Sequence, residues 1–105
     1  MFVAVEIWQV KRDIDERHDI SFMRYDYVKK RIPDLAKTYK DYYEKVYEYG
    51  EEIDVPEKVY LEQVFTDFNI NRPDDFKGHS LSVSDLVKLN DNLYFCDSFG
   101  YELLR

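Results

Sequence analysis

Residues 81–96, LSVSDLVKLNDNLYFC, carry the clearest fold signal in this chain. Apolar and polar residues alternate over 81–89 with a break at Asp85, a period that is typical of β-strands. Asn90-Asp91-Asn92 has the composition of a turn, and residues 93–96 return to β-forming types. The segment therefore predicts a β-hairpin, which residues 101–104 prolong.

Two further strands are predicted upstream of this hairpin. Residues 2–10 alternate loosely and are rich in β-branched and aromatic types. Residues 42–49 are ambiguous, because as a helix their apolar residues line up with those of residues 35–39. As a strand, alternate residues from Tyr43 to Tyr49 share one face. The density of aromatic residues favours the strand.

Helices are predicted in the remaining segments. Ser21 is a candidate N-cap for a helix that Pro33 ends, and residues 34–39 form a second short helical piece. A clearer helix follows Asp54, which forms a predicted capping box with Glu57. Its apolar residues at i, i+3, i+4 and i+7 are Leu61, Val64, Phe65 and Phe68.

These elements predict a small α+β domain, with a mostly antiparallel sheet and one or two helices packed on one face. The length of 105 residues fits a single domain over 1–105. Cys96 is the only cysteine, so no internal disulfide forms and a reducing cytoplasm is expected. No apolar run approaches the roughly 20 residues of a membrane span, and no signal peptide is evident.

The charge of the chain is concentrated in its middle. The net charge is −7, and residues 41–75 alone contain eleven acidic and three basic residues. Direct binding to nucleic acid is not expected, because that attraction depends on Lys and Arg. A fixed array of carboxylates can instead imitate phosphates and occupy the positive groove of a nucleic-acid-binding protein. A solvated acidic face is the alternative.

Tyrosines beside these carboxylates can supply contact area in such a complex. We therefore expect the partner-binding residues to come from one list: Asp41, Tyr43, Glu44, Tyr47, Glu48, Glu51, Glu52, Asp54 and Glu57. The expected partner is a basic, nucleic-acid-binding protein.

A second cluster has the residue types of a hydrolase. It includes a nucleophile, a base and an orienting group, but the spacing of its members is not diagnostic: His79, Ser80, Ser82, Ser84, Asp85, Cys96 and Asp97. In the alternative, the serines and Asp85 satisfy backbone donors in turns and Cys96 is a core residue. The isolated glycines and the two distant histidines predict no phosphate loop and no metal site. We expect a protein that is not an enzyme and uses no cofactor.

Residues 68–87, FNINRPDDFKGHSLSVSDLV, and residues 94–101, YFCDSFGY, resemble the YodL-like domain family. The family pattern includes P-x-D-F-x-G-H-S-L-S-V-S-D and a later D-S-F-G-F, where Tyr101 replaces the final Phe. Residues 7–10 and 43–47 are similar to its earlier strands. The resemblance is tight over 68–101 and loose elsewhere. It places His79 and Ser80 at the entry to the hairpin, where we expect their hydrogen bonds to tie the loop to the sheet; a role in recognition is the alternative.

The resemblance implies a setting in phages, plasmids and conjugative elements of Gram-positive bacteria, and it supplies no catalytic residues. Small acidic proteins from that setting are often counter-defence factors. We therefore expect an anti-CRISPR protein in the bacterial host cytoplasm that occludes a single-subunit, DNA-targeting (type II) Cas nuclease without turnover. The alternatives are an interaction module of a conjugative or replication complex, an anti-restriction DNA mimic, and the hydrolase.

Overall fold

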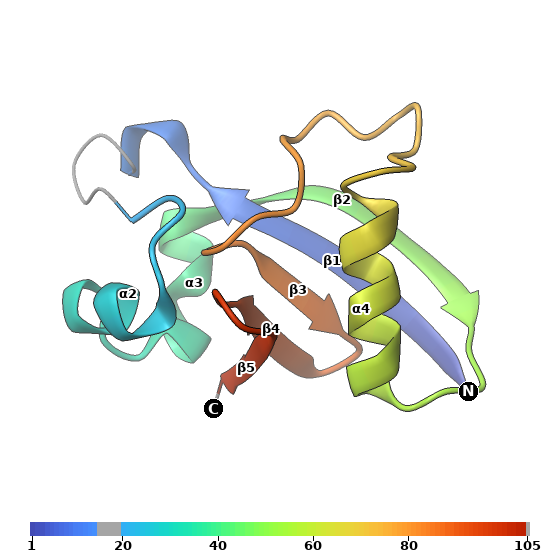
Figure 1. Cartoon of the computed structure of the whole chain (residues 1–105). Coiled ribbons are helices and arrows are strands. Elements are labelled where there is room, and N and C mark those ends of the chain that lie inside the picture. Colours follow the sequence, from blue (N-terminus) through green and yellow to red (C-terminus); the bar gives the residue numbers. More distant parts are fainter. Residues whose placement is uncertain (15–19, 105) are drawn as a thin grey trace.

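The computed structural model describes residues 1–14 and 20–104. Its strands form one five-stranded sheet in the order β2-β1-β3-β4-β5, and all neighbouring strands are antiparallel (Figure 1). The strands are β1 (Phe2–Val10), β2 (Tyr43–Glu52), β3 (Leu86–Leu89), β4 (Asn92–Cys96) and β5 (Tyr101–Leu104). The predicted hairpin is confirmed as β3–β4, and β1 and β2 confirm the two upstream strands.

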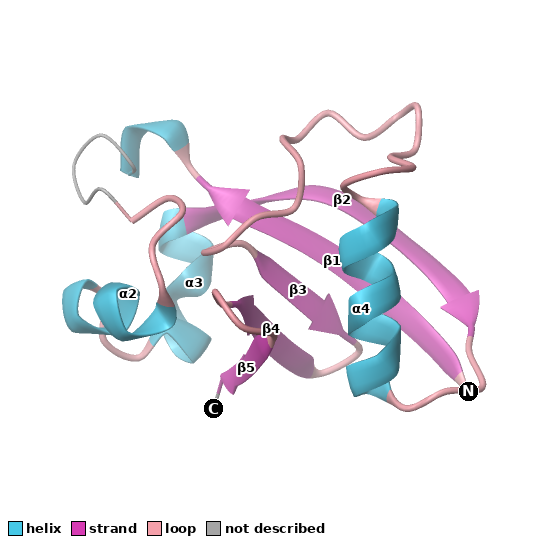
Figure 2. Cartoon of the chain, viewed as in Figure 1, coloured by secondary structure: helices cyan, strands magenta, loops and turns pink. Residues whose placement is uncertain are grey.

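Helices cover both faces of this sheet. They are α2 (Tyr25–Arg31), α3 (Leu35–Tyr42) and α4 (Glu57–Asp67). Figure 2 shows α4 across one face, and buried residues of α2 and α3 pack on the other. The predicted α+β class is confirmed, but its helices lie on two faces because the inner strands are apolar on both sides. The connection predicted over residues 11–19 lies partly outside the described residues.

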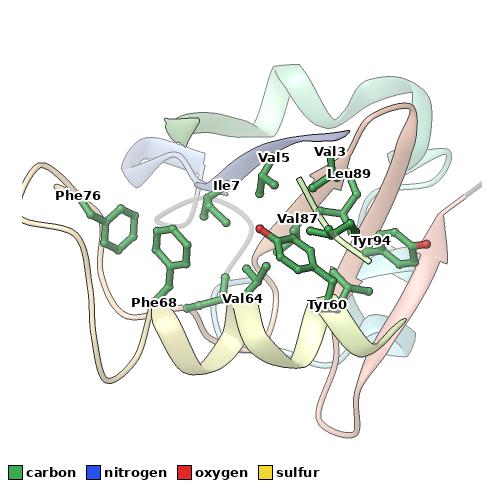
Figure 3. Packing of buried hydrophobic residues seen from close by; sticks show 13 residues of the cluster. Val3, Val5, Ile7, Tyr60, Val64, Phe68, Phe76, Val87, Leu89 and Tyr94 are labelled. Carbon is green, nitrogen blue, oxygen red and sulfur yellow. The ribbon is translucent and has the colours of Figure 1, made fainter. Parts of the chain in front are cut away.

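The face under α4 contains one hydrophobic core (Figure 3). Val5 of β1 and Val87 of β3 pack there with Val64 of α4, and all three are buried. The predicted stripe of α4 is partly wrong, since Phe65 is 42% exposed and Tyr60 is only 2% exposed. The helix turns a neighbouring stripe toward the sheet, formed by Tyr60, Leu61 and Val64 and continued by Phe68.

The opposite face contains a second core. Trp8 of β1, Leu86 of β3 and Phe95 of β4 pack there with Val28 of α2 and Leu35 of α3. Successive residues of a strand point to opposite faces, so the same inner strands supply side chains to both cores. The sheet is therefore held between α4 on one side and the α2–α3 pair on the other.

A β-bulge divides the edge strand β2. Tyr47 pairs with Ile7 and Lys45 pairs with Trp8, which leaves Val46 as an extra residue. An extra residue reverses the alternation of side chains. Tyr47 therefore faces α4 and Lys45 faces the α3 side, so the single face predicted for alternate residues of this strand is wrong.

Neither predicted N-cap forms. α2 begins well after Ser21, and α4 begins at Glu57 without a side-chain cap from Asp54. The carboxylate of Glu57 instead accepts hydrogen bonds from Asn92 at 2.9 Å and from the hydroxyl of Tyr94 at 2.7 Å. The tertiary contact between α4 and β4 thus replaces the local capping box.

Candidate functional site

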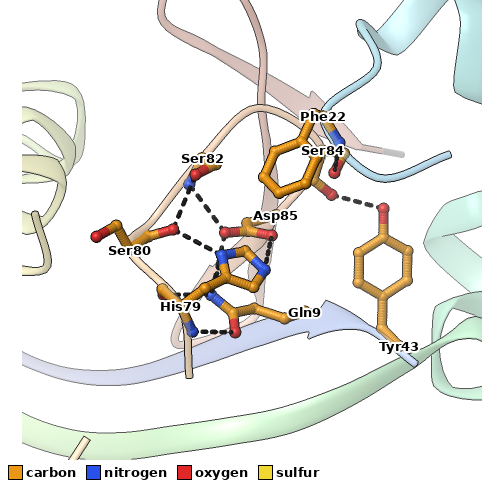
Figure 4. Close-up of polar contacts among 8 residues, drawn as sticks. All are labelled: Gln9, Phe22, Tyr43, His79, Ser80, Ser82, Ser84 and Asp85. Carbon is orange, nitrogen blue, oxygen red and sulfur yellow. Dashed lines mark hydrogen bonds and ion pairs between the residues drawn. The ribbon is translucent and has the colours of Figure 1, made fainter. Parts of the chain in front are cut away.

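A hydrogen-bond network surrounds the carboxyl group of Asp85, directly before β3 (Figure 4). Asp85 is 1% exposed, and its Oδ2 accepts hydrogen bonds from the N–H of Ser82 at 2.9 Å and from the side chain of Gln9 at 3.1 Å. Its Oδ1 lies 3.7 Å from Nε2 of His79. Gln9 also exchanges hydrogen bonds with the backbone of His79, at 2.9 and 3.2 Å. Gln9 of β1 thereby ties the loop before β3 to the sheet.

Ser84 occupies a strained backbone position beside this network. Its φ is +85°, a value that L-residues rarely adopt, and β3 consequently begins at Leu86 rather than at residue 81. The Ser84 carbonyl oxygen accepts a hydrogen bond from the hydroxyl of Tyr43 at 2.6 Å. Tyr43 is 1% exposed. Its expected role on a partner-binding surface is therefore wrong, because its side chain is buried and already bonded.

The network does not assemble an activated nucleophile. The Ser82 hydroxyl donates to the carbonyl oxygen of Ser80 at 2.8 Å, and the Ser84 hydroxyl oxygen accepts from the N–H of Phe22 at 2.9 Å. In the described part of the chain, no serine hydroxyl is hydrogen-bonded to His79. Burial raises the pKa of the Cys96 thiol to about 12, which keeps it protonated. The interpretation as partners of backbone donors is confirmed for Ser84 and Asp85, whereas the Ser82 hydroxyl instead serves a backbone acceptor.

The predicted partner-binding residues do not share one surface. Glu44 and Glu51 pair with residues of β1 that face α4, whereas Glu48 and Glu52 pair with residues of the opposite face. The others lie on different elements, with Asp41 in α3, Asp54 in the loop before α4 and Glu57 in the first turn of α4. Charges along an edge strand also hinder pairing with other chains, which explains part of this acidity structurally.

One group of side chains forms a small cleft between β2 and the end of α4, which we call the acidic cleft. Its volume is about 230 Å³, and it is lined by Tyr47, Tyr49, Glu51, Asp67, Phe68, Asn71 and Pro73. The ring of Tyr47 packs edge-on against Phe68 with 5.6 Å between centroids, and its hydroxyl donates to Asp75 at 2.8 Å. Both ends of the Tyr47 side chain are therefore fixed. At about 230 Å³ the cleft is smaller than most small-molecule pockets, which usually exceed about 300 Å³. Its size suits a single side chain.

The acidic cleft favours a positive charge. The pKa of Tyr49 is raised to about 12, chiefly because the hydroxyl is buried. The hydrogen bond with Tyr60 opposes this rise, and the nearby carboxylates of Glu51 and Asp67 contribute to it. Asp67 ends α4, whose last turn contains no basic residue, so the negative end of the helix dipole adds to the carboxylates. Neutral tyrosine rings beside carboxylates match the two surfaces that a guanidinium or ammonium group prefers.

The sequence singled out only part of this cleft. Among the predicted residues, Tyr47 and Glu51 line it. The other lining residues are not among the predicted ones: Tyr49, Asp67, Phe68, Asn71 and Pro73. Asp67 belongs to the acidic segment 41–75, so its charge marks it as a candidate in the sequence. Nothing in the sequence indicates that the loop after α4 lies next to β2.

Comparison of the sequence with models of protein families gives a match. The family model of the YodL-like domain matches residues 4–105, from within β1 to beyond β5. The chain belongs to the YodL-like domain family. Searches of curated proteins and of solved structures find no match.

In this YodL-like domain, the segment that most resembles the family, residues 68–87, includes Asn71 and Pro73 of the acidic cleft and the whole loop around Asp85.

Across residues 1–14 and 20–104, no helix has the length and apolar character needed to cross a membrane. Within the same residues, His, Cys, Asp and Glu side chains do not gather in any group of three that suits a metal ion.

Proposed function

We propose that this YodL-like domain is a non-catalytic binding protein whose acidic cleft receives a basic side chain of a nucleic-acid-binding partner. The observation that supports this most is the convergence of Glu51, Asp67 and two tyrosine rings at the negative end of α4. An arginine suits the cleft best, because a planar guanidinium can bond to carboxylates and stack on an aromatic face.

The charge around the cleft extends the attraction over a longer range. Residues 41–75 contain eleven acidic and three basic residues, a distribution that attracts a positive surface and speeds the encounter. Proteins that hold nucleic acid expose Arg and Lys for that purpose. Occupying one such residue excludes the nucleic acid, so the proposed mechanism is stoichiometric occlusion without turnover.

In its most specific form, the proposal describes a counter-defence protein of a phage or mobile element. It acts as an anti-CRISPR in the bacterial host cytoplasm and binds a single-subunit, DNA-targeting (type II) Cas nuclease. The setting implied by the family resemblance supports this form. An interaction module of a conjugative or replication complex would use the same cleft on a different partner.

The arrangement of charges favours a local contact over extended DNA mimicry. Glu51 and Glu44 emerge on one face of β2, and Glu48 and Glu52 on the other. An anti-restriction mimic needs carboxylates in one continuous row, because it replaces a row of phosphates. We therefore rank that function below the binding of a single basic side chain.

DNA cleavage by a purified, guide-loaded type II Cas nuclease tests the proposal. We expect the domain to abolish cleavage near equimolar amounts at about 50 mM salt and to inhibit less at about 200 mM salt. Full cleavage at low salt would overturn the anti-CRISPR form. A pull-down against the conjugation and replication proteins of the same element then tests the interaction-module form.

A further inference from the structure

The free edge of β5 is a second candidate site for an interaction. β5 pairs with β4 on one side and ends the sheet on the other, at the opposite edge from β2. Tyr101 and Leu103 of β5 pair with Cys96 and Tyr94, and Glu102 pairs with Phe95. Tyr101 and Leu103 therefore point to the α4 side, and Glu102 points to the side of α2.

A hollow lies beside this edge on the α4 side. Two adjoining hollows of about 410 and 600 Å³ share Glu62, Gly100 and Tyr101. Their apolar lining comes from α4 and from β4, β5 and the turn between them: Leu61, Phe65, Tyr94, Phe99 and Leu103. Phe99 is 96% exposed and Phe65 is 42% exposed. This is the space into which the side chains of a sixth strand would extend.

A third hollow lies beside the same edge, toward α2. It has a volume of about 350 Å³, and Glu102 lines it together with Arg24, Asp26 and Lys29. Glu102 also borders the larger hollow on the α4 side. Arg24 lies 3.6 Å from Asp26, and Lys29 lies over the ring of Tyr25. Glu102 has no hydrogen bond or ion pair with another described residue. Its carboxylate is therefore free for a cation on an added strand.

We propose that β5 accepts an extended segment of a partner protein as a sixth strand, with residues in the order apolar–basic–apolar. The two apolar side chains would enter the α4-side hollow opposite Tyr101 and Leu103. The basic side chain would lie opposite Glu102, where a cross-strand pair of opposite charge is favourable. Backbone hydrogen bonds to the free edge supply affinity, and the alternating side chains set the register, as in other cases of strand addition.

The same geometry argues against a second copy of this chain as the occupant. Filling both apolar positions with Tyr101 and Leu103 of a second copy would place Glu102 opposite Glu102, and like charges directly opposite are destabilising. The β2 edge is a poorer acceptor as well, because it carries a bulge and several glutamates. This proposal does not depend on the acidic cleft.

The test uses two synthetic peptides, one with Val-Lys-Val and one with Val-Glu-Val between threonines, titrated into the ¹⁵N-labelled domain. We expect the Val-Lys-Val peptide to bind severalfold more tightly and to shift the backbone amide signals of residues 101–104. Glu102→Lys should reverse the preference. The matched substitution Glu48→Lys, on the β2 edge, should leave it unchanged.

A second variant separates this site from the acidic cleft. Binding of the Val-Lys-Val peptide should survive the double substitution Glu51→Gln and Asp67→Asn. Equal binding of the two peptides, an unchanged preference in Glu102→Lys, or the absence of β5 shifts would overturn the proposal. Self-association of the domain through β5 would overturn it in favour of a second copy.

Discussion

The hydroxyl of Tyr47 donates a hydrogen bond to the carboxylate of Asp75 at 2.8 Å. This bond joins the edge strand β2 to the loop that follows α4, two segments that are distant in sequence. It fixes one wall of the acidic cleft, and it raises the pKa of Tyr47 chiefly because the phenol donates to a carboxylate. The cleft therefore depends on a tertiary contact rather than on the local run of acidic residues.

Tyr47→Phe should loosen the loop after α4 while it preserves the fold. The substitution keeps the ring against Phe68 and removes only the bond to Asp75. We expect the free energy of unfolding to change by no more than about 0.5 kcal/mol, as for most surface substitutions. Amide hydrogen exchange should become faster in residues 71–77. Unchanged exchange there would show that the bond does not hold the loop.

Tyr43→Phe should destabilise the domain without affecting the acidic cleft. The substitution leaves the buried carbonyl oxygen of Ser84 without its 2.6 Å partner, and an unsatisfied buried acceptor costs about 1–3 kcal/mol. Urea unfolding measures the loss, with Tyr27→Phe as the control, because the Tyr27 hydroxyl makes no hydrogen bond to a described residue. Equal stability of the two variants would contradict the buried role of Tyr43.

Asp85→Asn should remove much of the pH dependence of stability. Burial raises the pKa of Asp85 to about 8, although hydrogen bonds from Ser82 and Gln9 lower it, and an unfolded Asp has a pKa of about 3.9. The folded state thus holds this proton more tightly, so the free energy of unfolding falls as pH rises from about 4 to about 8. Urea unfolding at both ends of this range should show a smaller fall in Asp85→Asn. Identical falls would contradict the assignment.

Leu61→Ala and Phe65→Ala should differ in their effect on stability, although the sequence pattern alone gives both residues equal weight. Leu61 is 1% exposed and Phe65 is 42% exposed. We expect a loss of about 2–5 kcal/mol for Leu61→Ala, as for other buried leucines, and a clearly smaller loss for Phe65→Ala. Equal losses in urea unfolding would mean that α4 is rotated from the position described.

Local patterns predicted most of the fold. The alternation over 81–96 located the β3–β4 hairpin, and the residue types of 2–10 and 42–49 located β1 and β2. The bulge at Val46 could not be predicted, because it depends on the pairing of β2 with β1. The cover on both faces has a signal in the sequence, since Trp8 is a large apolar residue on the face of β1 opposite to Val5 and Ile7.

The candidate site was less predictable than the fold. Net charge identified the acidic segment, yet charge does not reveal which side chains share a face of a bulged strand. Tyr43 and Tyr47 are both tyrosines of β2, but they lie on opposite faces of the sheet. Tyr43 is buried in the core beside α2 and α3, whereas Tyr47 packs against the core under α4. Asp67 joins Glu51 only because α4 ends beside β2.

The most direct test of the central claim is an NMR titration of the ¹⁵N-labelled domain with a short arginine peptide. We compare the wild type with two double variants of equal charge. The first removes the cleft carboxylates through Glu51→Gln and Asp67→Asn. The second removes two carboxylates from the opposite face of β2 through Glu48→Gln and Glu52→Gln.

We expect shifts at Tyr47, Tyr49 and Asn71 in the wild type and in the second variant, and their loss in the first. Shifts that persist in the first variant, or that lie elsewhere on the domain, would contradict the claim that the acidic cleft receives a basic side chain.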